Sequence, residues 1–367
     1  MTRLPLDGLR VVAVEQAVAA PFCTARLADA GAEVVKIERP GGDFARGYDK
    51  AAAGQSSYFV WLNRGKQSRV LDLGADKGRA ALETLIAQAD VLVQNLKPGA
   101  MDKLGFDSAR LATGYPRLIN CVISGYGDSG PMAQRKAYDL LIQADAGLCS
   151  ITGGPAEPAR VGISVVDIAT GATAHAAILE ALIARGITGR GAHIAVSMFD
   201  VIAEWLTVPL LNHEAGHSPR RQGMVHPSIA PYGVFAASDG TPILLSVQSD
   251  REWRVLCDRF LGEPGLGTDP LFATNVARVA NRAQTDAAVA AGVGTRTGAQ
   301  AIDELVAIGL AVASVNDMAG LAAHPHLRRV TVDTPNGPVS LPAPAPIVDG
   351  RTRQTGAVPA LPDPDAG

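Results

Sequence analysis

The first half of the chain alternates short apolar runs with stretches of helical spacing, and this alternation restricts the possible folds more than any other feature. Apolar runs of strand length occur before residue 125 at 9–14, 33–38, 69–73, 91–95 and 118–124. Helical spacing over 19–30 and 77–88 separates some of them, as in βαβ units. Such units build a parallel sheet covered on both faces. We therefore predict an α/β fold with a large sheet domain.

The second half of the chain changes character near residue 216. Before it, the pattern predicts a helix over 167–185, a strand over 193–197 and a helix over 198–211. Residues 216–222 are rich in Gly, Pro, Ser and Arg, which favours a linker. Beyond it we predict a small α+β domain with paired strands at 231–235 and 242–247 and helices at 278–292 and 299–308. The expected domains are 1–215, 216–310, and a return to the large domain with an extended tail over 311–367.

Composition places the chain among ordinary globular enzymes. Of its 367 residues, 47% are hydrophobic and 19% are charged, which suits a large buried core. The formal net charge of -3 argues against nucleic acid or an anionic membrane as the main partner. The cysteines are scattered, which favours reduced thiols and a cytoplasmic location: Cys23, Cys121, Cys149 and Cys257. The most apolar long stretch, 165–184, includes Asp167, His175 and Glu180, so we expect a soluble protein.

Two motifs suggest other chemistry, and their context argues against it. His213 and His217 fit the HExxH pattern of zinc proteases, which requires both histidines on one face of a continuous helix. Gly216 lies within the motif and Pro219 follows it, so we predict a helix that ends there and no metal site. The turn after Val14 contains no glycine, which argues against a nicotinamide dinucleotide.

Asp167 ends an apolar run and opens a predicted helix. This spacing is typical of a helix N-cap, and taken alone it favours a structural cap. The same geometry would also suit a covalent nucleophile, because free backbone N–H groups and the helix dipole would keep the carboxylate ionised and hold a developing oxyanion. The residues alone leave both interpretations open.

Basic residues follow several of the predicted strands. Arg39 comes after the second strand, and Lys97 and Lys103 come after a later one. Open α/β sheets bind ligands at the carboxyl ends of their strands. Together with Lys136, these side chains would suit a nucleotide phosphate, although each one alone is typical of a solvated surface charge.

Motifs along almost the whole chain, taken together, resemble the class III CoA-transferase family, which includes formyl-CoA transferase, carnitine CoA-transferase and the α-methylacyl-CoA racemases. The matching segments occur in the same order as in the family: 6–12, 27–40, 95–105, 125–131, 138–144, 189–197, 315–318 and 324–327. The resemblance implies a Rossmann-like large domain and an interlocked homodimer. It also implies that coenzyme A or acyl-CoA is a substrate and that no cofactor is permanently bound.

The resemblance also assigns roles to residues. It makes Asp167 the nucleophile, and it implies CoA contacts by Arg39, Leu71, Leu73, Asn95, Leu96, Lys136 and Tyr138. Lys103 is expected to contact CoA as well, at a place where the family often has arginine. The family's common Gly-Glu-His-Thr ending is absent from the tail.

Tyr138 favours transfer over racemisation, because racemases of the family have a histidine at this place and a phenol with an ordinary pKa near 10 is a poor proton shuttle. His226 and Ser228 resemble a segment of members that handle short dicarboxylic acids, where they would bind a distal carboxylate. A racemase or epimerase, transfer within one diacid, and a non-catalytic CoA-binding protein stay open as alternatives.

Overall fold

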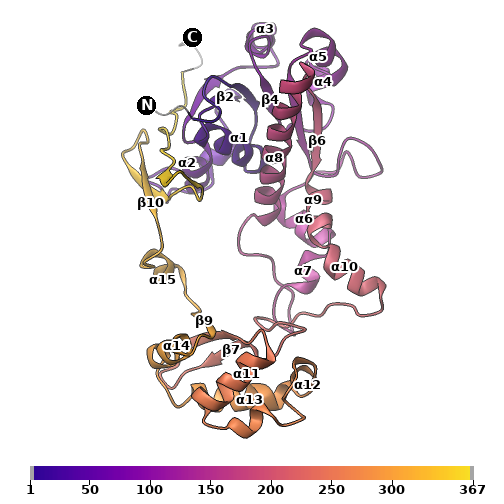
Figure 1. The fold of residues 1–367 in the computed structure, drawn as a ribbon. Helices are drawn as coiled ribbons and strands as arrows, with labels where there is room; N and C mark the ends of the chain where they lie inside the picture. Colours follow the sequence, from indigo (N-terminus) through magenta and orange to yellow (C-terminus); the bar gives the residue numbers. More distant parts are fainter. Residues whose placement is uncertain (1–3, 364–367) are drawn as a thin grey trace. The chain divides into compact units, whose positions relative to one another are not determined.

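The computed structural model describes residues 4–363, and the chain divides into two compact units (Figure 1). Of the described residues, the first unit holds 4–149, 160–219 and 328–363. The second unit holds residues 150–159 and 220–327. Each unit has a hydrophobic core of its own. The domain boundaries expected from the sequence, near 216 and 311, stay a prediction.

The first unit is built on a six-stranded sheet with the strand order β3-β2-β1-β4-β5-β6. All neighbouring strands are parallel, and Val12 pairs with Val35 on one side and with Leu92 on the other. The strands are β1 (Arg10–Val14), β2 (Glu33–Glu38), β3 (Lys66–Val70), β4 (Val91–Gln94), β5 (Ile119–Ser124) and β6 (His193–Ser197). The predicted α/β, Rossmann-like architecture is confirmed.

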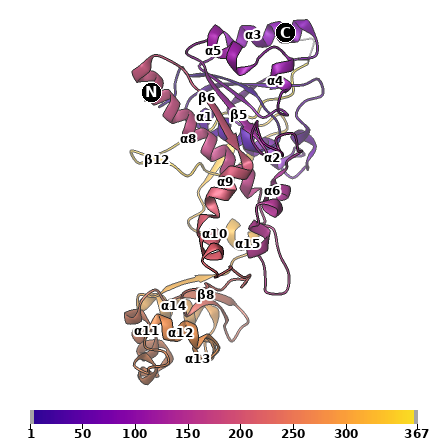
Figure 2. The same cartoon turned by 90° about the vertical axis from the view of Figure 1, so that its right-hand side faces the viewer.

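Helices cover both faces of this sheet (Figure 2). On one face, α1 (Ala19–Asp29) and α8 (Val165–Thr188) pack on side chains such as Val11 and Val93. On the other face, α3 (Asp76–Ile86), α4 (Ala100–Lys103) and α5 (Ser108–Gly114) pack on side chains such as Val12 and Leu92. Successive strand residues point to opposite faces, so continuous apolar runs serve both layers.

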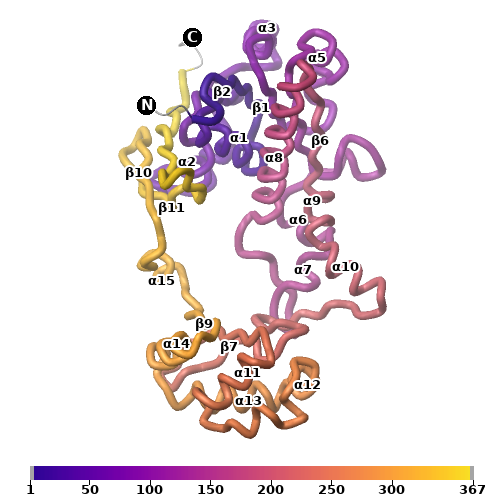
Figure 3. Tube along the Cα trace, in the orientation of Figure 1, coloured from indigo at the N-terminus to yellow at the C-terminus, as the bar shows by residue number. Residues whose placement is uncertain are grey.

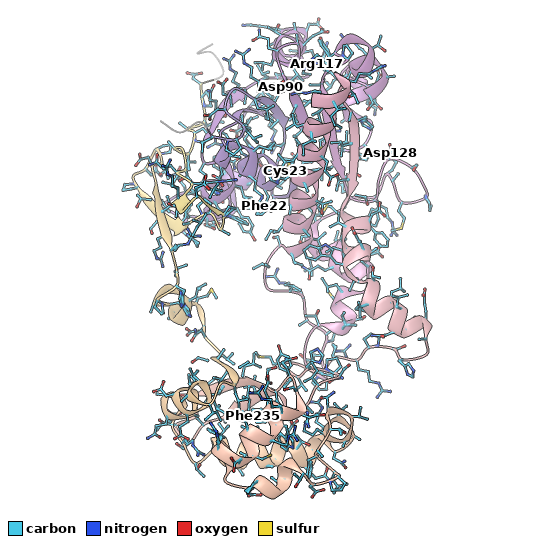
Figure 4. All side chains as sticks on the ribbon, in the orientation of Figure 1. Phe22, Cys23, Asp90, Arg117, Asp128 and Phe235 are labelled. Carbon is cyan, nitrogen blue, oxygen red and sulfur yellow. The ribbon has the colours of Figure 1, made fainter. Side chains whose placement is uncertain are left out.

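Gly171 allows α1 and α8 to approach closely. A Cβ at this position would lie 2.4 Å from the carbonyl oxygen of Ala19 and 3.0 Å from the Cβ of Phe22, which is labelled on α1 in Figure 4. The start of α8 is thereby held against the first helix of the sheet. By length and composition alone, α8 is the one described helix that could cross a membrane, but core helices pass the same test, and Val166 and Ile178 of α8 are fully buried.

The chain returns to the first unit as two antiparallel hairpins, β10 (Arg329–Val332) with β11 (Val339–Pro342) and β12 (Ile347–Val348) with β13 (Arg351–Thr352). The first hairpin lies beside α2 (Ser57–Asn63), where Val332 packs with Phe59 (Figure 3). Farther along the tail, Val358 is buried in the same cluster, and residues 353–363 form neither helix nor strand.

The second unit contains a three-stranded antiparallel sheet of β7 (Tyr232–Ala236), β8 (Pro242–Ser246) and β9 (Ala311–Ser314). Its core gathers Phe235 (Figure 4), Trp253 and Val289. The helices of this unit include α11 (Asp250–Leu256), α12 (Asn275–Ala280), α13 (Arg282–Val293), α14 (Gly298–Ala307) and α15 (Met318–Ala322). The α+β character agrees with the sequence analysis, which did not predict β9.

Two predicted elements differ from the structure. The edge strand β3 begins at Lys66 and ends at Val70, earlier than the apolar run at 69–73 suggested. The helix predicted over 198–211 is interrupted at Leu206 and forms α9 (Met198–Trp205) and α10 (Thr207–Glu214). Pro209 explains the break, because it has no N–H to donate to the carbonyl of Trp205.

Candidate active site

Asp167 lies in the first turn of α8, close to the start of α6 (Asp139–Asp145). Its side chain is half-buried, and within residues 4–363 no group donates a hydrogen bond to its carboxylate. Burial, together with the negative charge of Asp139, raises the pKa of Asp167 to about 7. Near neutral pH this carboxylate is therefore more basic, and less fully ionised, than an ordinary aspartate.

The expectation that Asp167 caps its own helix is wrong. The N-cap of α8 is Ser164, and Asp139 of α6 accepts hydrogen bonds from the backbone N–H groups of Val166 and Asp167, over 2.7 and 3.1 Å. The next N–H, that of Ile168, donates to the carbonyl of Ser164 over 3.0 Å. These N–H groups are therefore not free for an oxyanion, and with no donor of its own the carboxylate is less ionised, not more.

A cavity of about 260 Å³ opens at the carboxyl ends of β1, β2 and β3 and reaches Leu96 in the loop after β4. Its lining includes four of the residues expected to contact CoA: Arg39, Leu71, Leu73 and Leu96. The sheet order reverses between β1 and β4, so the cavity lies at the switch point where open α/β sheets bind ligands. Arg39 is exposed at the rim, and its Nε donates to the carbonyl of Gly42 over 3.1 Å.

The other four expected CoA contacts lie outside the lining of this cavity. Asn95 is engaged with the backbone of Gln16, in two hydrogen bonds of 2.9 and 3.0 Å. Lys103 is exposed at the end of α4, and Lys136 is exposed shortly before α6. Tyr138 is the N-cap residue of α6, directly before Asp139, and its side chain is 60% exposed.

A buried charge cluster underlies the loop after β1. Glu15 accepts from Lys66 over 2.7 Å, and Lys36 lies between Glu15, at 3.5 Å, and Asp43, at 2.8 Å, with all four side chains fully buried. Burial raises the pKa of Glu15, but Lys66 and Lys36 outweigh it and hold that pKa below its ordinary value. Burial lowers the pKa of Lys66 to about 8. The cluster fixes the floor of the cavity, which Glu15 and Asp43 help to line.

Two tyrosines near Asp167 were not predicted from the sequence. Burial, with the charges of Asp43 and Asp167, raises the pKa of Tyr48 to about 12. The ring of Tyr48 packs edge-to-face on that of Tyr58, and the hydroxyl of Tyr58 lies 3.3 Å from Oγ of Ser164. Their segment has no strand or long helical pattern, so only its aromatic residues could have drawn attention to it.

His226 and Ser228 belong to the second unit. The ring of His226 stacks on Tyr232, with centroids 5.2 Å apart, and its Nδ1 accepts the N–H of Ser228 over 3.2 Å. That bond leaves Nε2 as the N–H of the neutral ring. Arg282 holds the turn by donating to the carbonyl groups of His226 and Ile229, each over 2.8 Å.

The HExxH segment ends as a helix at Glu214, as predicted, and Nδ1 of His213 lies 2.7 Å from Oγ of Ser218. Within residues 4–363, no group of three or more His, Cys, Asp or Glu side chains is arranged to hold a metal ion. The four cysteines are all unpaired.

A doubly wound sheet, a cavity at its switch point and a carboxylate of raised pKa at a helix start define an α/β enzyme. The chain belongs to CoA-transferase family III, whose model matches residues 6–367. It is similar to the acetyl-CoA:oxalate CoA-transferase of Acetobacter aceti, with 40% identity over 92% of this chain and 87% of the relative. It is also similar to the succinate–glutarate CoA-transferase of Agrobacterium fabrum, with 38% identity over 76% of this chain and 72% of the relative.

Solved structures agree with this assignment. A CaiB/BaiF family protein from Brucella suis matches with a TM-score of 0.84 and 36% identity, covering 98% of this chain and 97% of that chain. The protein is therefore a class III CoA-transferase, and CoA thioesters are its substrates, as the sequence resemblance implied.

Proposed function

We propose that this enzyme transfers CoA from an acyl-CoA donor to a short dicarboxylic acid, with Asp167 as the covalent nucleophile. The observation that supports this role most strongly is the place of Asp167, half-buried in the first turn of α8 with its backbone held by Asp139, and burial raises its pKa as well. A carboxylate of higher pKa is a stronger nucleophile, and a pKa near 7 leaves about half of it ionised at neutral pH.

The proposed reaction passes the thioester through four exchanges at Asp167. The carboxylate attacks the donor thioester, which forms a mixed anhydride and releases CoA thiolate. The thiolate attacks the aspartyl carbonyl, which gives an aspartyl-CoA thioester and frees the donor acid. The acceptor carboxylate then attacks the aspartyl-CoA carbonyl, which forms a second anhydride and releases CoA thiolate. The thiolate finally attacks the acceptor carbonyl of this anhydride to give acceptor-CoA and free Asp167. Each step replaces one acyl bond by another, so the thioester energy is retained.

CoA is proposed to bind along the carboxyl edge of the sheet. The cavity lined by Arg39, Leu71, Leu73 and Leu96 offers an apolar wall with a cation at its rim, which suits an adenine ring beside phosphates. Lys103, Lys136 and Tyr138 are exposed and able to contact the rest of the ligand. Asn95 is proposed to act by holding Gln16 in place.

A dicarboxylate acceptor is supported by the names of the similar enzymes, which refer to oxalate, succinate and glutarate. His226 offers an Nε2–H and Ser228 an exposed hydroxyl, two donors for a distal carboxylate. We assign this role to them as part of the proposal, together with a cytoplasmic location, which unpaired cysteines suit.

A homodimer is also part of the proposal. The helices α9 and α10 expose four large apolar side chains, each at least half accessible: Trp205, Val208, Leu210 and Leu211. Ile183 and Ile187 of α8 are exposed as well, at 69% and 83%. Apolar patches of this kind mark interaction surfaces, and a second copy of the chain is the proposed partner. Sedimentation would test it, with a dimer expected and a monomer at micromolar concentration contradicting it.

The transfer itself is tested by incubating the enzyme with succinyl-CoA and, separately, oxalate, glutarate, mesaconate and a monocarboxylic acid. Formation of a new CoA thioester only when a dicarboxylate is present would support the proposal. Exchange of an α-proton for solvent deuterium without transfer would instead indicate a racemase. Isomerisation of one acyl-CoA without any acceptor would indicate transfer within a single diacid.

A further inference from the structure

Asp139 makes contacts that the proposed reaction does not yet use. Its side chain is 9% exposed, and both carboxylate oxygens are engaged. Oδ1 accepts from the backbone N–H groups of Val166 and Asp167, and Oδ2 accepts from Nε2 of Gln143 over 2.6 Å. The residue thus binds the peptide unit that carries the nucleophile.

Gln143 extends these contacts to the segment that leads into α8. Its side chain is fully buried, and its Oε1 accepts the N–H of Val161 over 2.9 Å. Asp139 and Gln143 together therefore hold residues 161–167 against α6 through hydrogen bonds with defined donors and acceptors.

The N-terminus of α8 is not capped by the side chain of its own N-cap residue. Ser164 occupies the N-cap position, but its side chain accepts no bond from the helix and lies instead near the hydroxyl of Tyr58. A carboxylate at the N-terminus of a helix normally stabilises the first turn by accepting its free N–H groups. Here the cap comes from α6, 28 residues earlier, so the place of Asp167 depends on Asp139.

The other titratable groups around Asp167 are phenols and acids. Tyr138 is the N-cap residue of α6, directly before Asp139, and Tyr48 and Tyr58 come from the segment after β2. The charge of Asp43 acts on Tyr48. None of these groups carries a positive charge. Asp139 is the charge that, after burial, raises the pKa of Asp167.

We propose that Asp139 is the positioning residue of the nucleophile: by accepting the backbone N–H groups of Val166 and Asp167 it fixes the start of α8 and places a negative charge beside the reacting carboxylate. This inference rests on the proposed role of Asp167. It gives the capping hydrogen bonds a purpose in the chemistry, because the same carboxylate that orders the helix start also sets the charge around the reacting group.

The test relocates the negative charge while keeping the hydrogen bonds. In the double variant Asp139→Asn with Gln143→Glu, the asparagine oxygen still accepts from Val166 and Asp167, and its NH₂ donates to the new carboxylate, which still accepts from Val161. The net charge of the protein is unchanged, but the negative charge moves from residue 139, which binds the backbone of Asp167, to residue 143. The matched control is Asp107→Asn, which alters the cap of α5 at the N–H of Arg110.

The readout is the rate of aspartyl-CoA formation from succinyl-CoA between pH 5 and pH 9. In the wild type and in Asp107→Asn, the rate should rise through a midpoint near the Asp167 pKa of about 7. In the double variant the midpoint should fall by about one pH unit, with a lower plateau rate because the nucleophile is less basic. An unchanged midpoint in the folded double variant would overturn the inference.

The two proposals fail separately. If Asp167→Ala still formed a covalent adduct and transferred CoA, the proposed nucleophile would be wrong. If Asp167→Ala were inactive and the double variant kept the wild-type midpoint and plateau, only the role of Asp139 would be wrong. Circular dichroism and thermal melting establish that each variant is folded before its pH profile is compared.

Discussion

The side-chain amide of Asn95 makes both of its hydrogen bonds with the backbone of Gln16, donating to the carbonyl over 2.9 Å and accepting from the N–H over 3.0 Å. These bonds join the loop after β4 to the loop after β1, across the point where the sheet order reverses. The neighbouring Ala17 has a φ of 62°, a left-handed conformation that is uncommon for alanine. The amide therefore holds a strained loop at the edge of the proposed CoA cavity.

Replacing this amide should weaken the binding of acyl-CoA more than it slows the chemical step. In Asn95→Ala the N–H and carbonyl of Gln16 lose their partners, so we expect a loss of about 1–3 kcal/mol in stability and a several-fold increase in KM for acyl-CoA. Steady-state kinetics and urea denaturation measure the two effects. Asn281→Ala removes similar amide bonds, to Leu271 and Ala277 in the second unit, and is expected to leave KM unchanged. An equal rise in KM for both variants would contradict this account.

Arg39 is expected to bind phosphate groups of CoA. Arg39→Ala should raise KM for acyl-CoA about tenfold with little change in kcat, since a charge-assisted hydrogen bond contributes about 1.5–3 kcal/mol. Added salt should reduce the difference in KM between the variant and the wild type, because the expected contact between Arg39 and phosphate is exposed to solvent. Arg110→Ala on α5 is the control. A loss of kcat with KM unchanged would assign Arg39 to the chemical step instead.

The buried charge cluster should be sensitive to the removal of one member. Lys66→Met leaves Glu15 buried with only Lys36 as a cation, 3.5 Å away, and we expect it to destabilise the fold by about 3 kcal/mol. Adding Glu15→Gln should recover part of this loss, because the uncompensated charge is removed. Urea denaturation of the two variants measures both the loss of stability and its partial recovery. Wild-type stability in the single variant would show that the cluster contributes little.

Stability should fall as pH rises through the titration of Asp167. The unfolded carboxyl ionises near pH 4, whereas the folded one has a pKa raised to about 7. The native state therefore binds more protons between these values, and its stability decreases as pH rises through that window. Asp167→Asn removes this decrease and should melt about 3 °C higher than the wild type at pH 8, but not at pH 4. Parallel melting curves at both pH values would contradict the raised pKa.

Local patterns predicted the sheet because most of its strands are apolar runs with clear ends in the sequence. The strands Glu33–Glu38 and His193–Ser197 begin and end where the sequence placed them, since turns and polar residues delimit both. The edge strand β3 begins earlier than predicted. Lys66 is buried at its start through the ion pair with Glu15, and a charged residue gives no apolar signal in the sequence.

The contacts around Asp167 could not be predicted from a local sequence pattern, because they join residues that are far apart in the chain. The position of Asp167 at the end of an apolar run and the start of a helix predicted a cap, and the family resemblance implied a nucleophile. Neither shows that Asp139 accepts the N–H groups of the helix. That contact spans 28 residues and depends on the packing of α6 against α8. Tyr48 was missed for the same reason, because only the folded chain brings it near Asp167.

The most direct test of the central claim is the intact mass of the protein after incubation with succinyl-CoA in the absence of an acceptor. We predict a covalent adduct equal to CoA less one water, located by peptide mapping to Asp167, labile to hydroxylamine and discharged by an acceptor dicarboxylate. Asp167→Ala, although folded, should form no adduct and transfer no CoA. An adduct on another residue, or full transfer by Asp167→Ala, would contradict the account.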